Sequence, residues 1–202
     1  MSALPISKET SPLVLHFGAR LERLSDREFY EFCQLNPDLR LERAVGGDLI
    51  IMSPTGGESG RLNSVLNMRC GLWAEEDGTG VCCDSSTGFS LPNGAQRSPD
   101  LSWIKRERWE ALSPAEREVF PPICPDFVVE LRSRSDNLST LQDKMREYID
   151  SGAQLGWLID PYSSEVYIYR PDADVEKLAA PEELSGEPEL PGFRLDMKPF
   201  WK

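Results

Sequence analysis

The strongest constraint on the fold is a strand, a helix and a second strand that follow one another without a break. The compact apolar run from Asp126 to Leu131 predicts the first strand. A helix is expected from Leu138 to Ser151, because Gly152 stands where glycine commonly ends a helix. Leu155 to Asp160 predict the second strand. Strands and helices that alternate along a chain indicate a mixed α/β sheet flanked by helices.

The remaining segments extend this pattern. Ser25 and Glu28 form a capping-box signature, which predicts a short helix that ends near Asn36. A longer helix is expected over residues 58–76, where apolar side chains recur at helical spacing. Residues 165–170 form a predicted hairpin with the strand before them. Further strands are predicted at residues 39–43, 48–52, 80–83, 88–91 and 100–104, and short helices within residues 105–122.

The chain has 202 residues, which suits one compact domain. We expect a core domain at residues 25–171, preceded by an N-terminal arm at residues 1–24. Residues 172–202 form a predicted acidic C-terminal extension, with an edge strand near residues 193–197. The Pro- and Glu-rich residues 171–190 are expected to be loose. The predicted fold class is therefore α/β (mixed α+β), with an N-terminal helix and a β-hairpin added to the sheet.

The charge balance excludes a generally basic nucleic-acid-binding protein. Lys and Arg together number 22 against 34 Asp and Glu, so the formal net charge is -12. A nucleic-acid partner would need a local basic rim, or bound cations, to overcome long-range repulsion. The residues expected to form such a rim are Arg132, Arg134, Lys144 and Arg146.

Histidine and cysteine usage exclude other kinds of site. The single histidine, His16, lies in the N-terminal stretch, so histidine-based catalysis and zinc binding are not expected. The five cysteines form no CxxC pair, and no secretory leader precedes the chain, so a reducing, cytoplasmic setting is expected. No apolar run approaches the ~20 residues that a membrane-spanning helix needs.

Two carboxylates stand at the boundaries of predicted strands. Asp100 begins one strand and Glu130 nearly ends another. Such a carboxylate is costly to bury unless it is paired or binds a cation. Two of them on adjacent strands would form an oxygen site that suits Mg²⁺, and we expect Mn²⁺ to substitute. An ion held there can orient a phosphodiester and lower the pKa of an attacking water.

Three further residues are candidates for the same site. Lys144, on the helix that follows Glu130, could stabilise the negative charge of a phosphate, or act on the attacking water if burial lowered its pKa. Tyr148 shares its helix face. Glu58 begins the long helix. Structural explanations stay open, because Lys144 also reads as an exposed helix lysine and Glu58 as a residue that favours the helix dipole.

Most of the chain resembles a known family. The phrases that carry the resemblance are MSPTGGESGRLN (52–63), SPDLSWI (98–104), RWEAL (108–112), PDFVVELRSRSD (125–136), LQDKMREYIDSGAQLGWLIDP (141–161) and VYIYRP (166–171). In their order and spacing they resemble the Uma2 family (DUF820) of the restriction-endonuclease-like, PD-(D/E)XK superfamily. The resemblance runs from about residue 25 to residue 171 and implies a metal-dependent nuclease fold, with a central mixed sheet between helices.

The resemblance also implies a set of catalytic and metal-binding residues. Asp100 and Glu130 would be the metal carboxylates, and the backbone carbonyl of Leu131 a further ligand. Glu58 would be the acidic residue that the first core helix contributes. These residues match the family's motif at their positions in this sequence.

The lysine of the superfamily motif is displaced. Arg132 stands two positions after Glu130, where the motif has lysine, and arginine is a poor base. By the resemblance, Lys144 on the following helix takes the place of that lysine. Arg132, Arg134 and Tyr148 are the expected contacts to DNA.

The leading hypothesis is a Mg²⁺-dependent endonuclease that hydrolyses DNA phosphodiester bonds. The alternative is a nuclease fold retained as a binding or assembly module without turnover, which the net charge of -12 and Arg132 favour. An acidic mimic of DNA ranks last, because the acidic residues are interleaved with basic ones. A homodimer is a further expectation, with the apolar hairpin from Leu155 to Tyr169 as its surface.

Overall fold

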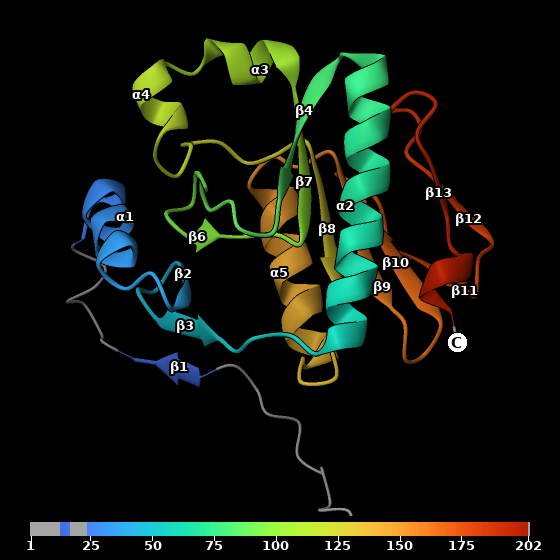
Figure 1. Ribbon diagram of the computed structural model, residues 1–202, viewed down its shortest axis with the longest axis horizontal. Coiled ribbons are helices and arrows are strands. Elements are labelled where there is room, and N and C mark those ends of the chain that lie inside the picture. Colours follow the sequence, from blue (N-terminus) through green and yellow to red (C-terminus); the bar gives the residue numbers. More distant parts are fainter. Residues whose placement is uncertain (1–12, 17–23, 202) are drawn as a thin grey trace, which may run out of the picture.

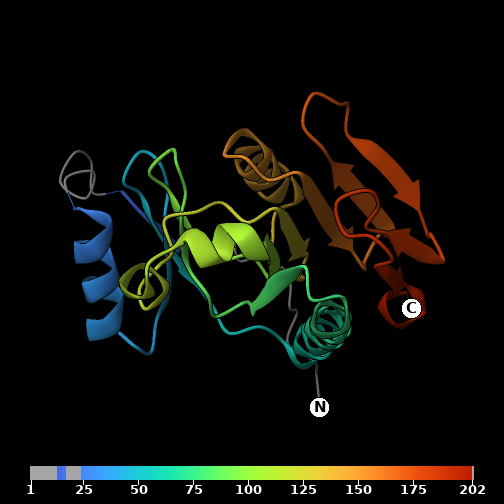
Figure 2. The same ribbon diagram turned by 90° about the horizontal axis from the view of Figure 1, so that it is seen from above.

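In the computed structural model, which describes residues 13–16 and 24–201, a six-stranded mixed sheet lies between two long helices (Figures 1 and 2). Helix α2 (Gly57–Asp77) covers one face and α5 (Leu138–Asp150) covers the other. Strands β8 (Phe127–Leu131) and β9 (Leu155–Asp160) run parallel, and the other neighbouring strands of this sheet run antiparallel. The predicted fold class is confirmed. The strand order is β11 (Glu176–Ala179), β10 (Glu165–Tyr169), β9 (Leu155–Asp160), β8 (Phe127–Leu131), β7 (Leu101–Lys105) and β4 (Gly80–Asp84).

A second sheet lies beside the first and is covered by α1 (Asp26–Leu35) (Figure 1). The predicted capping box begins α1, with the Ser25 side chain accepting from the backbone N–H of Glu28. Of the predicted arm, β1 is described, and residues 1–12 and 17–23 lie outside the described part of the chain. The strand order is β1 (Leu13–Leu15), β3 (Leu49–Met52), β2 (Arg40–Arg43), β6 (Gln96–Arg97) and β5 (Phe89–Ser90).

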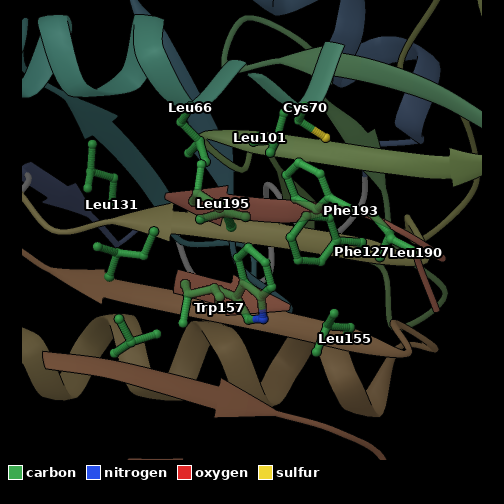
Figure 3. Close-up of a cluster of buried hydrophobic side chains, with 14 of the residues drawn as sticks. Leu66, Cys70, Leu101, Phe127, Leu131, Leu155, Trp157, Leu190, Phe193 and Leu195 are labelled. Carbon is green, nitrogen blue, oxygen red and sulfur yellow. The ribbon is translucent and has the colours of Figure 1, made fainter. Parts of the chain in front are cut away.

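The two faces of the central sheet carry separate cores. On the α2 face, Phe127 and Trp157 pack edge to face with their ring centroids 4.8 Å apart (Figure 3). On the α5 face, Val128 packs with Met145 and Tyr148. Because successive side chains of a strand point to opposite faces, β8 sends Phe127 and Val129 towards α2 and its even-numbered residues towards α5. Glu130 therefore points towards α5.

The C-terminal segment belongs to the core of the α2 face. The prediction that residues 171–190 are loose is wrong, because β11 extends the central sheet and β12 (Glu183–Ser185) pairs with β13 (Arg194–Asp196). A 3₁₀ helix follows at Lys198–Phe200. Prolines and acidic residues hide this packing in the sequence, because they separate the apolar residues that a periodic pattern would need. The side chains buried against the α2 face include Leu184, Leu190, Phe193, Leu195, Met197 and Phe200.

Replacing Phe193 with alanine is expected to lower the free energy of unfolding by about 3–5 kcal/mol, the usual cost for a buried aromatic residue. Phe193 is 1% exposed and stacks on Trp157 with ring centroids 5.9 Å apart. Urea denaturation measures the loss, with Leu72→Ala as control, because Leu72 is 57% exposed on α2. Equal stability of the two variants would contradict this packing.

The predicted dimer surface is also wrong. The hairpin from Leu155 to Tyr169 corresponds to β9 and β10, which pair with β8 on one side and β11 on the other. The Trp157 side chain is fully buried. The hairpin therefore lies inside the sheet, and its apolar residues pack in the core of the same chain.

The remaining helices and residues mostly follow the sequence. Helices α3 (Arg106–Ala111) and α4 (Pro114–Arg117) confirm the short helices expected within residues 105–122. His16 lies 2.9 Å from Asp48, and all five cysteines are free thiols. None of the helices in the described ranges is long and apolar enough to cross a bilayer.

Candidate active site

A cavity of about 350 Å³ opens where the two sheets meet. One wall is the face of the β2–β3 ladder that points away from α1, and the other is formed by α5 and the residues before it. The first turns of α2 and the ends of β7 and β8 complete the lining. The cavity therefore lies at the strand ends where the sequence places its two carboxylates.

Asp100 and Glu130 are brought together by the register of β7 and β8. Leu101 pairs with Val129, so Asp100 and Glu130 face each other one position beyond the ladder. One carboxylate oxygen of Asp100 accepts from the backbone N–H of Leu131 at 2.8 Å. The other accepts from the Asn63 side chain of α2 at 3.1 Å. The Asp100 carboxylate is therefore held in place from the sheet and from α2.

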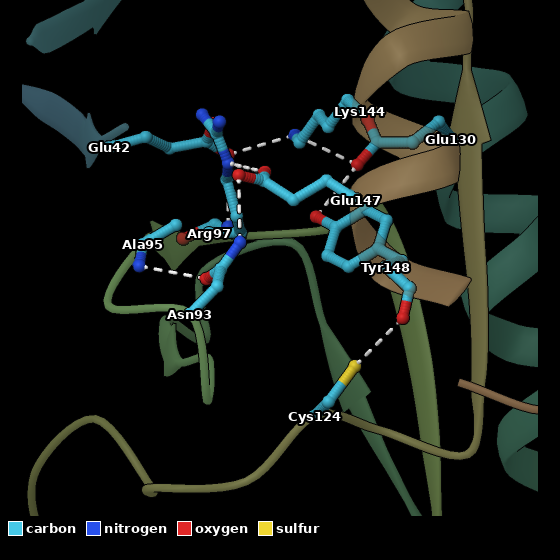
Figure 4. Close-up of polar contacts among 10 residues, drawn as sticks. Glu42, Asn93, Ala95, Arg97, Cys124, Glu130, Lys144, Glu147 and Tyr148 are labelled. Carbon is cyan, nitrogen blue, oxygen red and sulfur yellow. Dashed lines mark hydrogen bonds and ion pairs between the residues drawn. The ribbon is translucent and has the colours of Figure 1, made fainter. Parts of the chain in front are cut away.

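Lys144 reaches Glu130 from α5 (Figure 4). Its Nζ lies 2.8 Å from Oε1 of Glu130 and 2.8 Å from Oε1 of Glu42. The hydroxyl of Tyr148, one helical turn along, donates to the same Glu130 oxygen at 3.1 Å. The structure thus brings Asp100, Glu130, Leu131, Lys144 and Tyr148 to one place, as the sequence predicted. Because Tyr148 is fully buried, it positions Glu130 and cannot contact DNA directly.

Sequence reasoning missed three charged residues of this cluster. Glu42 is 2% exposed and pairs with Arg97 at 3.2 Å as well as with Lys144. Arg97 in turn lies 2.5 Å from Glu147 of α5. Glu42 alternates with the buried Leu41, which is typical of a residue that faces solvent. Its actual partner on α5 lies 102 positions away, so no local signal identifies it.

The cluster carries more negative than positive charge. Glu42, Asp100, Glu130 and Glu147 face two cations, Lys144 and Arg97, which leaves an excess of two negative charges when all are ionised. Burial raises the pKa of Glu130 to about 7. Lys144 opposes this rise in the pKa, and the negative charge of Asp100 adds to it. Burial likewise raises the pKa of Asp100 above its usual value. A divalent cation would compensate this excess.

Lys144 is held in its charged form. Burial alone would lower its pKa, but the carboxylates of Glu130 and Glu42 outweigh burial and raise the pKa above its usual value. Burial would raise the pKa of Glu42, but Lys144 and Arg97 lower it overall. Lys144 is therefore an ammonium group at neutral pH in this environment, which suits a fixed positive charge better than a base.

The oxygens of Asp100 and Glu130 fit a hard divalent ion. No group of three or more His, Cys, Asp or Glu side chains suited to a metal occurs among residues 13–16 and 24–201. Two carboxylates are nonetheless enough for Mg²⁺, which usually keeps several waters. Asp100 and Glu130, with the neighbouring carbonyl of Leu131, could therefore hold such an ion.

The structure does not bring Glu58 into the cluster. Its carboxylate pairs with Arg61 at 2.7 Å and is about half exposed. The residues of α2 that line the cavity are Ser59 and Asn63, one turn apart. A helix turns by about 100° per residue, so Glu58 points away from the face that Ser59 and Asn63 share.

The two arginines predicted to contact DNA have other partners. Arg132 donates to the Asp160 carboxylate at 2.8 Å and to the backbone carbonyl of Asp136 at 3.2 Å. The guanidinium of Arg134 lies over the ring of Tyr162, 5.4 Å from its centroid. Neither arginine lines the cavity.

Comparisons with known proteins identify the family and the fold of the chain. The profile of the Uma2 family, described as "Putative restriction endonuclease", matches residues 26–198. The chain is similar to a crystal structure described as "a putative nuclease belonging to DUF820" from Anabaena variabilis, with a TM-score of 0.72 and 20% sequence identity. That similarity covers 88% of this chain and 97% of the other. No curated protein matches. Since the family profile spans most of its length, the chain belongs to the Uma2 family.

Proposed function

We propose that this protein is a divalent-metal-dependent endonuclease that hydrolyses DNA phosphodiester bonds. The observation that carries the proposal is the meeting of Asp100 and Glu130 at the strand ends, with Lys144 bound to Glu130. Membership of a family described as "Putative restriction endonuclease" supports the same chemistry.

Each residue of the cluster has a role in this proposal. Asp100, Glu130 and the carbonyl of Leu131 would hold Mg²⁺, for which Mn²⁺ would substitute. When bound, the ion supplies positive charge to the scissile phosphate and lowers the pKa of an attacking water. Lys144 presents a permanent ammonium group that stabilises the charge developing on the phosphate. Tyr148 keeps the Glu130 carboxylate in place through its hydrogen bond.

Incubation of the purified protein with supercoiled plasmid and with circular single-stranded DNA tests this proposal. We expect Mg²⁺ or Mn²⁺ to support conversion to nicked or linear DNA, and EDTA to stop it, because the paired carboxylates need an ion to act on the phosphate. Gel electrophoresis measures the conversion. A failure to cut both of these DNAs with either ion, or cutting that EDTA leaves unchanged, would contradict the proposal.

A binding or assembly module is the second candidate. It is favoured by the net charge of -12 and by the engagement of Arg132 with Asp160, which removes one cation from the expected basic rim. Calorimetric titration with Mn²⁺ separates the two candidates. A nuclease site binds Mn²⁺ and loses the binding in Glu130→Ala, whereas no binding, or binding unchanged in that variant, would favour the module.

A further inference from the structure

The cavity beside the carboxylates is walled by the second sheet. In the β2–β3 ladder, Arg40 pairs with Met52 and Glu42 with Ile50, and all four side chains line the cavity. Figure 4 shows Glu42 reaching across from β2 to Lys144 on α5. This ion pair closes one side of the site. The space that remains, about 350 Å³, is the size of a small-molecule pocket and is far too small for a double helix.

Two of the three cations that line the cavity are paired with carboxylates, and the third, Arg40, donates to the backbone carbonyl of Ser85. Lys144 pairs with Glu42 and Glu130, and Arg97 pairs with Glu42 and Glu147. Double-stranded DNA carries one negative charge per about 1.7 Å of its axis, so its binding depends on several cations that contact phosphates. A chain with a net charge of -12 and a cavity in which Lys144 and Arg97 are already paired offers few of them. A single strand has a lower charge density and needs fewer such contacts.

One wall of the cavity is apolar, and a metal-binding site alone does not require such a surface. Ile50 and Met52 alternate with Leu49 and Ile51, which pack in the α1 core, so they present their side chains to the cavity. Both are only half-buried, and Leu141 of α5 also lines the space. An apolar surface in the same cavity as the carboxylates suits the face of a nucleobase, the part of an unpaired nucleotide that proteins recognise by packing.

We propose that the cavity takes one unpaired nucleotide of single-stranded DNA, with its base against Ile50 and Met52 and its phosphate at Asp100 and Glu130. The inference rests on the proposed nuclease function and adds its substrate class. A duplex would have to expose an unpaired nucleotide at a loop, gap or end before it could enter.

Binding and cleavage of matched oligonucleotides test this inference. Fluorescent DNA of one sequence is prepared as a single strand, a blunt duplex and a duplex with a central unpaired loop. Fluorescence anisotropy in Ca²⁺ measures affinity, and gel analysis in Mg²⁺ measures cleavage. We expect the single strand to bind at least about tenfold more tightly than the blunt duplex, and cuts in the looped duplex to fall within the loop. Equal or tighter binding of the blunt duplex would overturn the inference.

Two methionine variants test the apolar wall. Met52→Ala is expected to weaken single-strand binding about fivefold, because part of the surface against the base is lost. Met68→Ala is the matched control, since Met68 is 55% exposed on α2 and does not line the cavity. Thermal unfolding checks that both variants fold. If Met52→Ala does not fold, Ile50→Ala takes its place in the binding assay. Equal affinities in the wall and control variants would contradict the assignment of the wall.

The two readouts separate this inference from the proposed function. Selective binding of the single strand without cleavage in Mg²⁺ would support the pocket and contradict the hydrolysis. Cleavage of single strand and blunt duplex at equal rates would support the hydrolysis and overturn the substrate class.

Discussion

Replacing Asp100 with asparagine, or Glu130 with glutamine, is expected to reduce Mg²⁺-dependent DNA cleavage by about 10³-fold, at the upper end of the loss seen when one charge-stabilising group is removed. Both substitutions keep the shape of the side chain and remove its charge. An amide at position 100 can still accept from the backbone N–H of Leu131, which now donates to Asp100 at 2.8 Å. For Asp100→Asn, the loss would therefore come from weaker ion binding and not from unfolding. Initial rates on end-labelled DNA measure it.

Glu76→Ala is the matched control, because Glu76 is an exposed carboxylate on α2 that does not line the cavity. It should cleave at the rate of the unmodified protein. Glu58→Ala in the same assay tests whether Glu58 belongs to the site. Activity should persist if Glu58 lies outside the cluster, as in the structure, and should fall if Glu58 has the role that the family resemblance implies. Cleavage that survives in both Asp100→Asn and Glu130→Gln would reject the site.

Replacing Lys144 with alanine is expected to affect activity and stability together. Removing one partner of a buried ion pair costs about 3–5 kcal/mol, because the remaining charge stays buried. Here two carboxylates, which are 2% and 6% exposed, would lose their shared partner. Arg97 still pairs with Glu42, so we expect the lower end, about 3 kcal/mol. Cleavage should fall about 10²–10³-fold, because the charge on the phosphate loses its ammonium partner.

Urea denaturation and the cleavage assay measure the two effects. Lys177→Ala is the control, because Lys177 pairs with Glu165 while more than half of its side chain is exposed, and water screens that pair. Lys144→Arg retains the positive charge and should recover much of the stability. If Lys144→Ala is as stable as Lys177→Ala, then Lys144 does not form the buried ion pairs with Glu42 and Glu130 that the structure contains.

Local signals in the sequence predicted the parts of the fold that local interactions determine. The capping box at Ser25 begins α1, helical spacing identified α2, and Gly152 marked the end of α5 to within a few residues. Asp100 and Glu130 could be singled out because a carboxylate at the end of an apolar strand is costly without a partner. The resemblance to the family then pointed to Lys144, which contacts Glu130 in the structure.

The rest depends on contacts between distant parts of the chain. Glu42 reads as a solvent-facing strand residue, and only the packing of α5 against the second sheet turns it into a buried partner of Lys144. The resemblance to the family placed Glu58 in the site, but its position in the sequence does not fix which way that helix face points. The C-terminal strands lack a periodic pattern, since their stability comes from packing against α2 and the central sheet.

A crystal of this protein soaked in Mn²⁺ tests the central claim most directly, because anomalous scattering locates the ion without any assay of activity. The account predicts one peak between the carboxylates of Asp100 and Glu130, with oxygen contacts close to the ~2.1 Å typical of Mg²⁺. It also predicts that the peak disappears in Glu130→Gln. An anomalous map with no peak between these carboxylates, or with its strongest peak elsewhere on the molecule, would contradict the account.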